Sequence, residues 1–203
     1  HFIKPLQKSA PDMHLVIEEG YTSGLRKRLR NGEVDVILVS LPFTEPDVVV
    51  QPLYEEEFVV LLPKGHSLSK NHAVASHDLD NENVLLMGEG HCFRDQVFQI
   101  LPNINKNKNK SESALIRTMT EGSSLETLCH MVSSGLGITV LPKSAAVGAI
   151  ERSNELVIKP FHDFTPTRTT AMAWRASFPR HKAIDTLRQA INISKLPGIS
   201  GNK

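Results

Sequence analysis

The sequence predicts an α/β fold of two lobes. A nearly continuous apolar, β-branched run at residues 34–41 has the pattern of a strand that is covered on both faces of a sheet. It follows a segment with helical spacing at residues 23–31, so helix and strand alternate along the chain. These segments form two clusters, at residues 1–57 and 64–160, and each is too short for one large α/β domain. The last part of the chain supplies a strand and a helix that can rejoin the first cluster, which predicts two lobes with a double crossover.

The first lobe is predicted to begin with a helix, a turn and a strand. The helix covers residues 2–10, Pro11 belongs to its stop, and the apolar run at residues 14–18 has strand character. Thr22 is placed to cap the next helix, and Gly32 is placed to end it. The remaining strands expected in this part of the chain are residues 34–41, 48–53 and 57–62.

The second lobe is predicted from shorter segments. A buried strand at 84–87 precedes a helix at 92–101, and residues 103–113 are low-complexity and basic, which predicts a solvated loop. Ser123 and Glu126 form a capping-box signature that opens another helix. The other elements expected are strands at 138–141, 155–160 and 169–174 and a closing helix at 183–193.

Composition excludes several classes of protein. Lys and Arg together number 23 against 22 Asp and Glu, a net charge of +1, so nothing in the charge predicts nucleic-acid binding by the chain itself. No stretch approaches the roughly 18 apolar residues of a membrane helix. Two cysteines do not make a disulfide scaffold, which favours a reducing, cytoplasmic location. The chain opens at His1 in what reads as the middle of a helix, so we interpret it as a fragment of a longer protein.

The segment "GEGHCFRDQ" at residues 88–96 carries the most specific chemistry. Cys92 lies at a predicted helix start, where backbone N–H groups and the helix dipole favour an anion. Such a position lowers the pKa of a cysteine thiol, and the thiolate is the form that attacks peroxide. His91 and Arg94 flank the thiol. The alternative is that Cys92 is a small buried apolar residue, the interpretation that we favour for Cys129 in its apolar helix.

Other hydroxyl and cationic side chains are candidates for an anion or peroxide pocket. Thr22, Ser123 and Ser124 stand at predicted helix starts, where plain capping is the alternative role. Arg168 precedes the last strand. If it points into the pocket, it can hold a carboxylate or polarise a peroxide, and the alternative is that it is an ordinary surface arginine. The cysteines lack zinc-ligand spacing, and no nucleotide-binding loop or hydrolase nucleophile elbow is found, so neither a metal nor a cofactor is expected.

Four stretches resemble the effector-binding domain of the LysR-type transcriptional regulators. Within that family, "GEGHCFRDQ" and "SLETL" are similar to the hydrogen-peroxide sensors of the OxyR type. The resemblance covers nearly the whole chain. Its four stretches are "LRNGEVDVILV" at 29–39, "PLYEEEFVVLLPKGHSL" at 52–68, "SSLETLCHMVSSGLGITVLP" at 123–142, and the strand after Arg168.

The resemblance implies a periplasmic-binding-protein-like fold of type II, with two Rossmann-like subdomains. Subdomain I would comprise residues 1–60 and 167–203, without its first strand, and subdomain II residues 61–166. A winged helix-turn-helix N-terminal to this chain would bind DNA. The regulatory domain would form a homodimer or tetramer and respond to a small oxidant or effector, with no role for a membrane and no enzymatic turnover.

The resemblance also assigns roles to individual residues. Cys92 matches the peroxide-reactive cysteine, Thr22 a pocket threonine, His91 the histidine beside the thiol, and Arg168 a pocket arginine. This chain departs from the peroxide sensors at Leu101, where they carry a resolving cysteine.

The departure at residue 101 leaves several functions open. A one-cysteine peroxide response is the main hypothesis, and a 92–129 disulfide is not expected. One alternative is a regulator that binds a small anionic effector in the cleft between the lobes without redox chemistry. A one-cysteine peroxidase and a secreted solute-binding protein are less favoured.

Overall fold

The computed structural model describes residues 2–104, 124–194 and 199. The chain divides into two compact units. Unit 1 comprises His1–Glu56 and Arg168–Lys203, and unit 2 comprises Glu57–Thr167. Both units combine helices with antiparallel strand pairs, and the predicted α/β class is confirmed.

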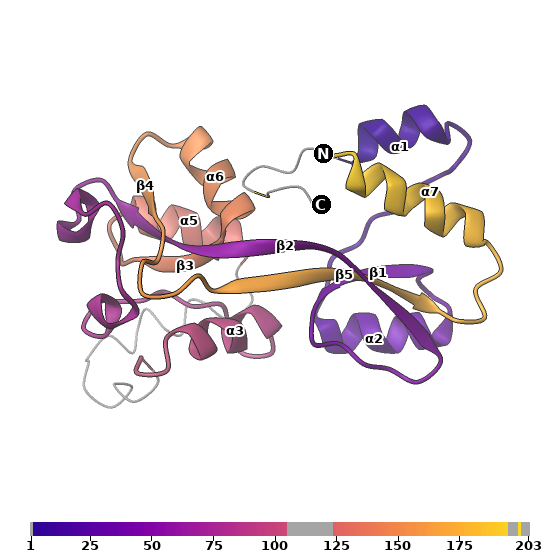
Figure 1. Ribbon diagram of the computed structural model, residues 1–203, viewed down its shortest axis with the longest axis horizontal. Coiled ribbons are helices and arrows are strands. Elements are labelled where there is room, and N and C mark those ends of the chain that lie inside the picture. The colour runs from indigo at the N-terminus through magenta and orange to yellow at the C-terminus, as the bar shows by residue number, and fades with distance from the viewer. Residues whose placement is uncertain (1, 105–123, 195–198, 200–203) are drawn as a thin grey trace. The chain divides into compact units, whose positions relative to one another are not determined.

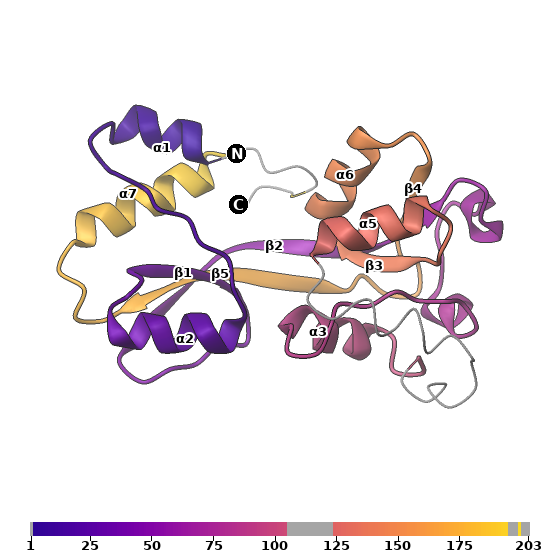
Figure 2. The same ribbon diagram turned by 180° about the vertical axis from the view of Figure 1, so that it is seen from behind.

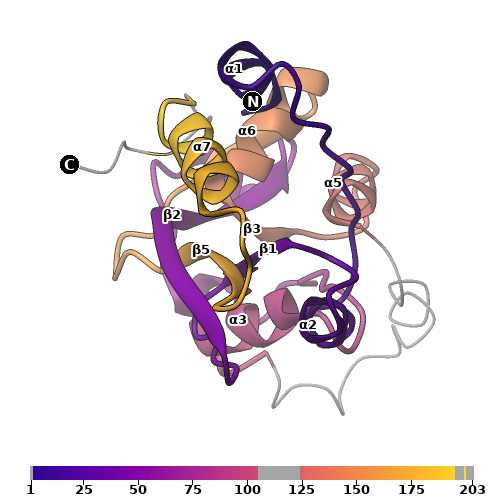
Figure 3. The same ribbon diagram turned by 90° about the vertical axis from the view of Figure 1, so that its right-hand side faces the viewer.

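Unit 1 is built on the pairing of strands β1 and β5. Their register runs from Val36 opposite Trp174 to Ser40 opposite Thr170. Helices α1 and α7 lie side by side on one face of this pair, and α2 lies on the other (Figures 1 and 3). The elements are α1 (Ile3–Ser9), α2 (Thr22–Asn31), β1 (Val36–Ser40), β5 (Thr167–Arg175), α7 (His181–Asn192) and the first part of β2 (Val48–Pro63).

Alternation along β5 gives unit 1 two apolar clusters. Met172 and Trp174 pack with α7, whereas Ala173, between them, packs with Leu29 of α2. Successive side chains of a strand point to opposite faces, so a strand covered by helices on both faces is apolar at nearly every position. In β1 only one face is well covered, because Ile37 and Val39 are buried whereas Leu38 between them is 44% exposed.

The strand predicted at residues 14–18 is not formed. These residues lie in no helix or strand, and Leu15, Val16 and Ile17 are 39, 82 and 61% exposed. Among the described strands, β1 pairs with β5 alone, so the segment has no ladder in this structure. It lines one wall of a groove of about 680 Å³, with β1 residues and helix α7 on the other side. An apolar pattern indicates a strand only where a neighbouring backbone completes the hydrogen bonds.

Unit 2 is centred on the second part of β2. This strand pairs with β3 (Thr139–Pro142), where Phe58 faces Pro142, and with β4 (Leu156–Lys159), where Pro63 faces Leu156. Helices α5 (Leu125–Ser133) and α6 (Lys143–Arg152) lie on one side of these strands and α3 (Cys92–Ile100) on the other (Figure 2). Two short 3₁₀ helices, Ser67–Lys70 and Ser76–Leu79, follow β2.

Three further expectations differ from the structure. The strands predicted at 48–53 and 57–62 are one strand, because Pro52 precedes the part of β2 that pairs with β3 and β4 and so interrupts neither ladder. The strand predicted at 84–87 is reduced to an isolated bridge between Val84 and Ile138. Helix α6 was not predicted. The loop predicted at 103–113 lies mostly outside the described residues.

Within the described residues, we find no helix with the length and apolar character needed to cross a membrane.

Candidate functional site

Helix α3 places Cys92 at its first position with the side chain exposed. Phe93, Val97 and Ile100 are buried and follow the three- and four-residue spacing of one helix face. Phe93 packs in the unit 2 core, with its ring centroid 6.0 Å from that of Phe58. Because the apolar face is fixed by these three residues, Cys92 is held on the accessible side of the helix start.

The N-cap of α3 is His91, as its place before the helix predicts. Its backbone is extended, and its side chain makes no capping hydrogen bond to the helix. Gly90, just before it, has φ of 87°, a left-handed conformation that glycine adopts without strain. The turn at Gly90 therefore brings the chain into the helix so that His91 and Cys92 are neighbours at its positive end.

Arg94 fixes the loop that precedes the helix. Its Nη1 donates to the carbonyl oxygen of Met87 at 2.9 Å, and its guanidinium lies 5.4 Å from the centroid of the Phe98 ring. Its Nη2 lies 3.8 Å from a carboxylate oxygen of Glu89. The sequence placed Arg94 beside Cys92 as a flanking cation, and the structure gives it these contacts with the loop and with Phe98.

Gln96 is a candidate that the sequence analysis missed. It follows Cys92 by four residues, a spacing that places two side chains on neighbouring turns of one helix side. Within the described part of the chain, its Oε1 is buried and accepts no hydrogen bond. A buried acceptor left unsatisfied costs about 1–3 kcal/mol, so this oxygen is suited to an O–H donor that binds there. The signal in the sequence was the spacing of Cys and Gln in "HCFRDQ".

Thr22 is the first residue of α2 rather than its cap. The N-cap is Tyr21, and no side chain makes a capping hydrogen bond. The prediction that Thr22 caps the helix was therefore wrong by one position, since an apolar pattern does not fix where a helix begins. Gly32 ends α2 as predicted, in the left-handed conformation with φ of 79°.

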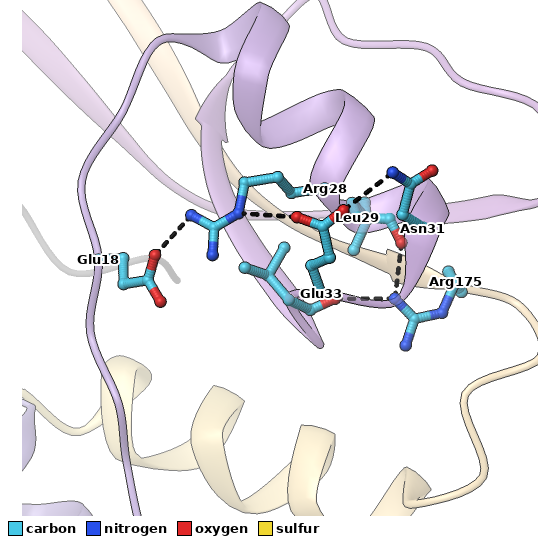
Figure 4. Close-up of polar contacts among 7 residues, drawn as sticks. Glu18, Arg28, Leu29, Asn31, Glu33 and Arg175 are labelled. Atoms are coloured by element: carbon cyan, nitrogen blue, oxygen red, sulfur yellow. Dashed lines mark hydrogen bonds and ion pairs between the residues drawn. The ribbon is translucent and has the colours of Figure 1, made fainter.

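Polar contacts hold α2 in place within unit 1. Arg28 lies between Glu18 and Glu33, and its hydrogen bond to Glu18 lowers the pKa of that carboxyl (Figure 4). Arg175 of β5 donates from Nη1 to the carbonyl oxygens of Leu29 and Val34, at 2.6 and 2.8 Å. These contacts tie the end of the helix to the strand, and so fix the position of the helix that carries Thr22.

Ser124 acts as a helix cap. Its Oγ accepts a hydrogen bond from the backbone N–H of Thr127 at 3.3 Å, and α5 begins at Leu125. The capping box was predicted one residue earlier, and Ser123 lies outside the described residues. Of the two roles open for Ser124, the structure shows the capping role.

Arg168 is not a surface arginine. Its Nε and Nη2 donate to Oε2 of Glu56 at 3.0 and 2.8 Å, and its side chain is 20% exposed. Glu56 is 2% exposed, so the pair is an internal ion pair of unit 1. Sequence patterns did not predict Glu56 as the partner, because the two residues are 112 positions apart.

The remaining sulfur and metal chemistry is limited. Cys129 is a buried thiol in α5, and desolvation raises its pKa. Leu101, at the position of the expected resolving cysteine, is 1% exposed and belongs to the unit 2 core. Across the residues that the structure describes, no group of three His, Cys, Asp or Glu side chains is arranged to hold a metal ion.

Comparison with known proteins assigns the family. The model of the LysR substrate binding domain matches residues 1–193. The chain belongs to this family. The fold is accordingly the predicted periplasmic-binding-protein-like type II, with two Rossmann-like subdomains and a double crossover.

Within the LysR family, the chain is similar to proteins named for hydrogen peroxide. It is 33% identical over 181 residues to a probable hydrogen peroxide-inducible genes activator of Streptomyces viridosporus, covering 89% of this chain and 56% of that protein. The reduced form of OxyR from Neisseria meningitidis superposes with a TM-score of 0.88 at 39% identity, covering 100% of this chain and 91% of the other.

A full-length OxyR variant from Pseudomonas aeruginosa gives a TM-score of 0.84 at 42% identity, covering 97% of this chain and 63% of the other. The chain thus spans somewhat more than half the length of the Streptomyces and Pseudomonas proteins.

Proposed function

We propose that this chain is the regulatory domain of a transcriptional regulator of the LysR family that responds to hydrogen peroxide through Cys92. The observation that carries the proposal is the exposed thiol at the first position of α3. Two comparisons support the proposal. The Streptomyces relative is named as a probable hydrogen peroxide-inducible genes activator, and the similar solved structures are of OxyR.

The proposed reaction is oxidation of the Cys92 thiolate by one molecule of peroxide. The sulfur attacks one peroxide oxygen, an S–O bond forms, and the O–O bond breaks. The sulfur loses two electrons and becomes sulfenic acid. The second oxygen leaves as hydroxide, and it takes up the proton that the Cys92 thiol released on ionising, so that water is formed. A helix N-terminus favours the attacking thiolate over the neutral thiol.

The other candidate residues bind or polarise the peroxide in this proposal. The Oε1 of Gln96 accepts a hydrogen bond from a peroxide O–H, since it is a buried acceptor without a partner among the described residues. The Thr22 hydroxyl and His91 hydrogen-bond to the peroxide, and Arg168 stabilises the departing oxygen. Ser123 and Ser124 are the remaining candidates for this pocket.

The fate of the sulfenic acid follows from the absence of a cysteine at residue 101. Leu101 is a core residue, and the other cysteine, Cys129, is buried with a raised pKa. We therefore propose that the signal is the sulfenate itself or a mixed disulfide of Cys92 with a small thiol. Either adds bulk and polarity at the start of α3, where a change of helix position passes to the rest of the protein.

The partners of the whole protein are part of the proposal. We infer a regulator that resides in the cytoplasm, binds DNA through a winged helix-turn-helix outside this chain, and forms a homodimer or tetramer through the domain described. In this scheme the domain is a sensor that reacts once per signal and is not an enzyme.

A second candidate function is favoured by Leu101. A domain of the same family without a resolving cysteine is equally suited to a small anionic effector that binds without redox chemistry. In that case the helix starts at Thr22 and Ser123 would hold the anion, and Cys92 would be incidental.

The deciding experiment treats the reduced protein with stoichiometric peroxide and measures intact mass after trapping sulfenic acid with dimedone. The native chain is compared with Cys92→Ser and Cys129→Ser. Rapid trapping that needs Cys92 alone supports the proposal, and a loss of 2 Da that needs both cysteines replaces it with an intramolecular disulfide. A Cys92 that reacts no faster than a small free thiol excludes the redox function and favours the anionic effector.

A further inference from the structure

Gln96 carries a polar atom for which the described part of the chain supplies no partner. Its Oε1 is buried and accepts no hydrogen bond there. A buried acceptor without a hydrogen bond is costly, because it has lost its contact with water and gained no other contact, and native structures hold few such atoms. The oxygen therefore indicates a donor that reaches it in another state of the protein.

Helix geometry directs this oxygen toward Cys92. Both residues belong to α3, within unit 2. An α-helix turns by about 100° per residue, so Gln96 lies one turn after Cys92 and about 40° around the helix from it, on the side of the buried Phe93. Long side chains of a helix point back toward its N-terminus. The Gln96 amide is thus directed toward the turn of Cys92, at the border between the exposed thiol and the buried face of the helix.

The cation next to Cys92 does not supply the donor. Arg94 lies about 160° around α3 from Gln96, and its guanidinium contacts the carbonyl oxygen of Met87, at 2.9 Å, and the ring of Phe98. On the Gln96 side of the helix, the donor that the proposed reaction creates is the O–H of the Cys92 sulfenic acid. A thiol is a weak donor and a thiolate is none, so oxidation supplies a stronger donor than the reduced cysteine does.

We infer that the Oε1 of Gln96 accepts the hydrogen bond of the Cys92 sulfenic acid, and that this contact keeps the oxidised protein at the sulfenic stage. The inference rests on the proposed function, because the sulfenic acid is the product of the proposed reaction. The S–O–H group donates only while it carries its proton. A hydrogen bond made only by the neutral form favours that form, so the contact disfavours the sulfenate anion.

The sulfenate is the form that reacts further with peroxide, as the thiolate is the reactive form of the thiol. Its sulfur forms a bond to one oxygen of a second peroxide, and the O–O bond breaks. The departing hydroxide takes the proton of the new S–O–H group and leaves as water, while the sulfur loses two more electrons and becomes sulfinate. A resolving cysteine would prevent this step by forming a disulfide, but residue 101 is leucine. The Gln96 contact slows the step instead.

The test measures two rate constants on the reduced protein. Sulfenic acid formation with one equivalent of peroxide is followed by dimedone trapping, and sulfinic acid formation after a second, excess portion of peroxide is followed by intact mass. Gln96→Leu removes the acceptor with little change in side-chain volume, and Gln96→Glu keeps an acceptor oxygen. Gln99→Leu is the matched control, because Gln99 lies on the same side of α3 and is exposed. Circular dichroism and the thermal midpoint establish that each variant is folded.

We expect the two reactions of Gln96→Leu to change in opposite directions. Sulfinic acid formation should be at least about fivefold faster than in the native chain, whereas sulfenic acid formation should not be faster. Gln96→Glu should form sulfinic acid no faster than the native chain, and Gln99→Leu should leave both rates unchanged. A disturbance of the helix that merely exposes or covers Cys92 would change both rates in the same direction, and that result overturns the inference.

Failure of the inference is distinguishable from failure of the proposed function. If the native chain forms sulfenic acid rapidly but Gln96→Leu forms sulfinic acid at the native rate, only the role of Gln96 is wrong. The same holds if Gln96→Glu forms sulfinic acid as fast as Gln96→Leu, because an acceptor oxygen then gives no protection. If the native chain forms no sulfenic acid at Cys92, both the proposed function and the inference are overturned.

Discussion

Replacing Leu101 with cysteine tests whether α3 keeps residues 92 and 101 apart. The two positions are nine residues apart along the helix, and a rise of 1.5 Å per residue separates them by about 13 Å. A disulfide needs Cα atoms within about 7 Å. A bond between Cys92 and a cysteine at 101 therefore requires that α3 unwinds.

The free-energy cost of that unwinding follows from the burial of the helix. Exposing Phe93, Val97 and Ile100 costs about 1.5–3 kcal/mol each, roughly 4–9 kcal/mol together. Closing a loop of this size returns about 3 kcal/mol by restricting the unfolded chain. The oxidised variant should thus be several kcal/mol less stable than its reduced form, a fall of roughly 10 °C in thermal midpoint for a chain of this size.

The assay combines three measurements on Leu101→Cys before and after stoichiometric peroxide. Intact mass should fall by 2 Da, helical circular dichroism should decrease, and the thermal midpoint should drop. Leu101→Ala controls for the lost side chain, which costs about 2–5 kcal/mol in a core, and Leu101→Cys with Cys92→Ser controls for the new thiol alone. A disulfide that forms with no loss of helix or of stability would refute the reasoning that α3 separates the two positions.

Three other predictions concern single side chains. Phe93→Ala should lower the free energy of unfolding, measured by urea titration, by about 3–5 kcal/mol, because it leaves a cavity in the core. A loss below about 1 kcal/mol would show that Phe93 contributes little to the core. At pH 8, iodoacetamide should alkylate Cys92 well before Cys129, as followed by mass spectrometry. Burial raises the pKa of the Cys129 thiol, so little of it is in the reactive thiolate form at that pH. Equal rates of alkylation would contradict this prediction. The hydrogen bond from Arg28 lowers the pKa of Glu18. The contribution of this contact to folding stability is therefore present above the ordinary carboxyl pKa, and it is lost as the pH falls through the lowered pKa. The thermal midpoint of Arg28→Gln should therefore fall less on acidification than that of the native chain. An equal fall in both proteins would contradict the contact.

Elements with a strong apolar pattern were the ones that could be predicted from the sequence. The run at 34–41 contains β1, whose Ile37 and Val39 are buried in one apolar cluster with Leu29 of α2. The helix at 92–101 is α3 because three buried residues repeat at helical spacing. The position of Cys92 at the helix start followed from that pattern, since a glycine-rich turn and then an apolar period mark where the helix begins.

Features that depend on distant parts of the chain could not be predicted. The apolar run at 14–18 carries no information about whether a neighbouring strand completes its hydrogen bonds. Glu56 is one of three consecutive glutamates, and nothing local distinguishes the buried one that holds Arg168. The spacing from Cys92 to Gln96 places the two side chains on one side of the helix, but it does not show that the Gln96 Oε1 is buried and without a partner among the described residues.

The groove beside β1 has a consequence for handling the protein. In the described residues, β1 is paired on one edge only, and the exposed aliphatic side chains of Leu15, Val16 and Ile17 lie beside it. An open strand edge next to exposed apolar side chains can add strands from other molecules and so form intermolecular sheets. We expect concentrated solutions to scatter light increasingly on storage. A lysine in place of Val16, which is 82% exposed, should suppress that growth without altering the fold, because charge on an open edge disfavours further strand addition.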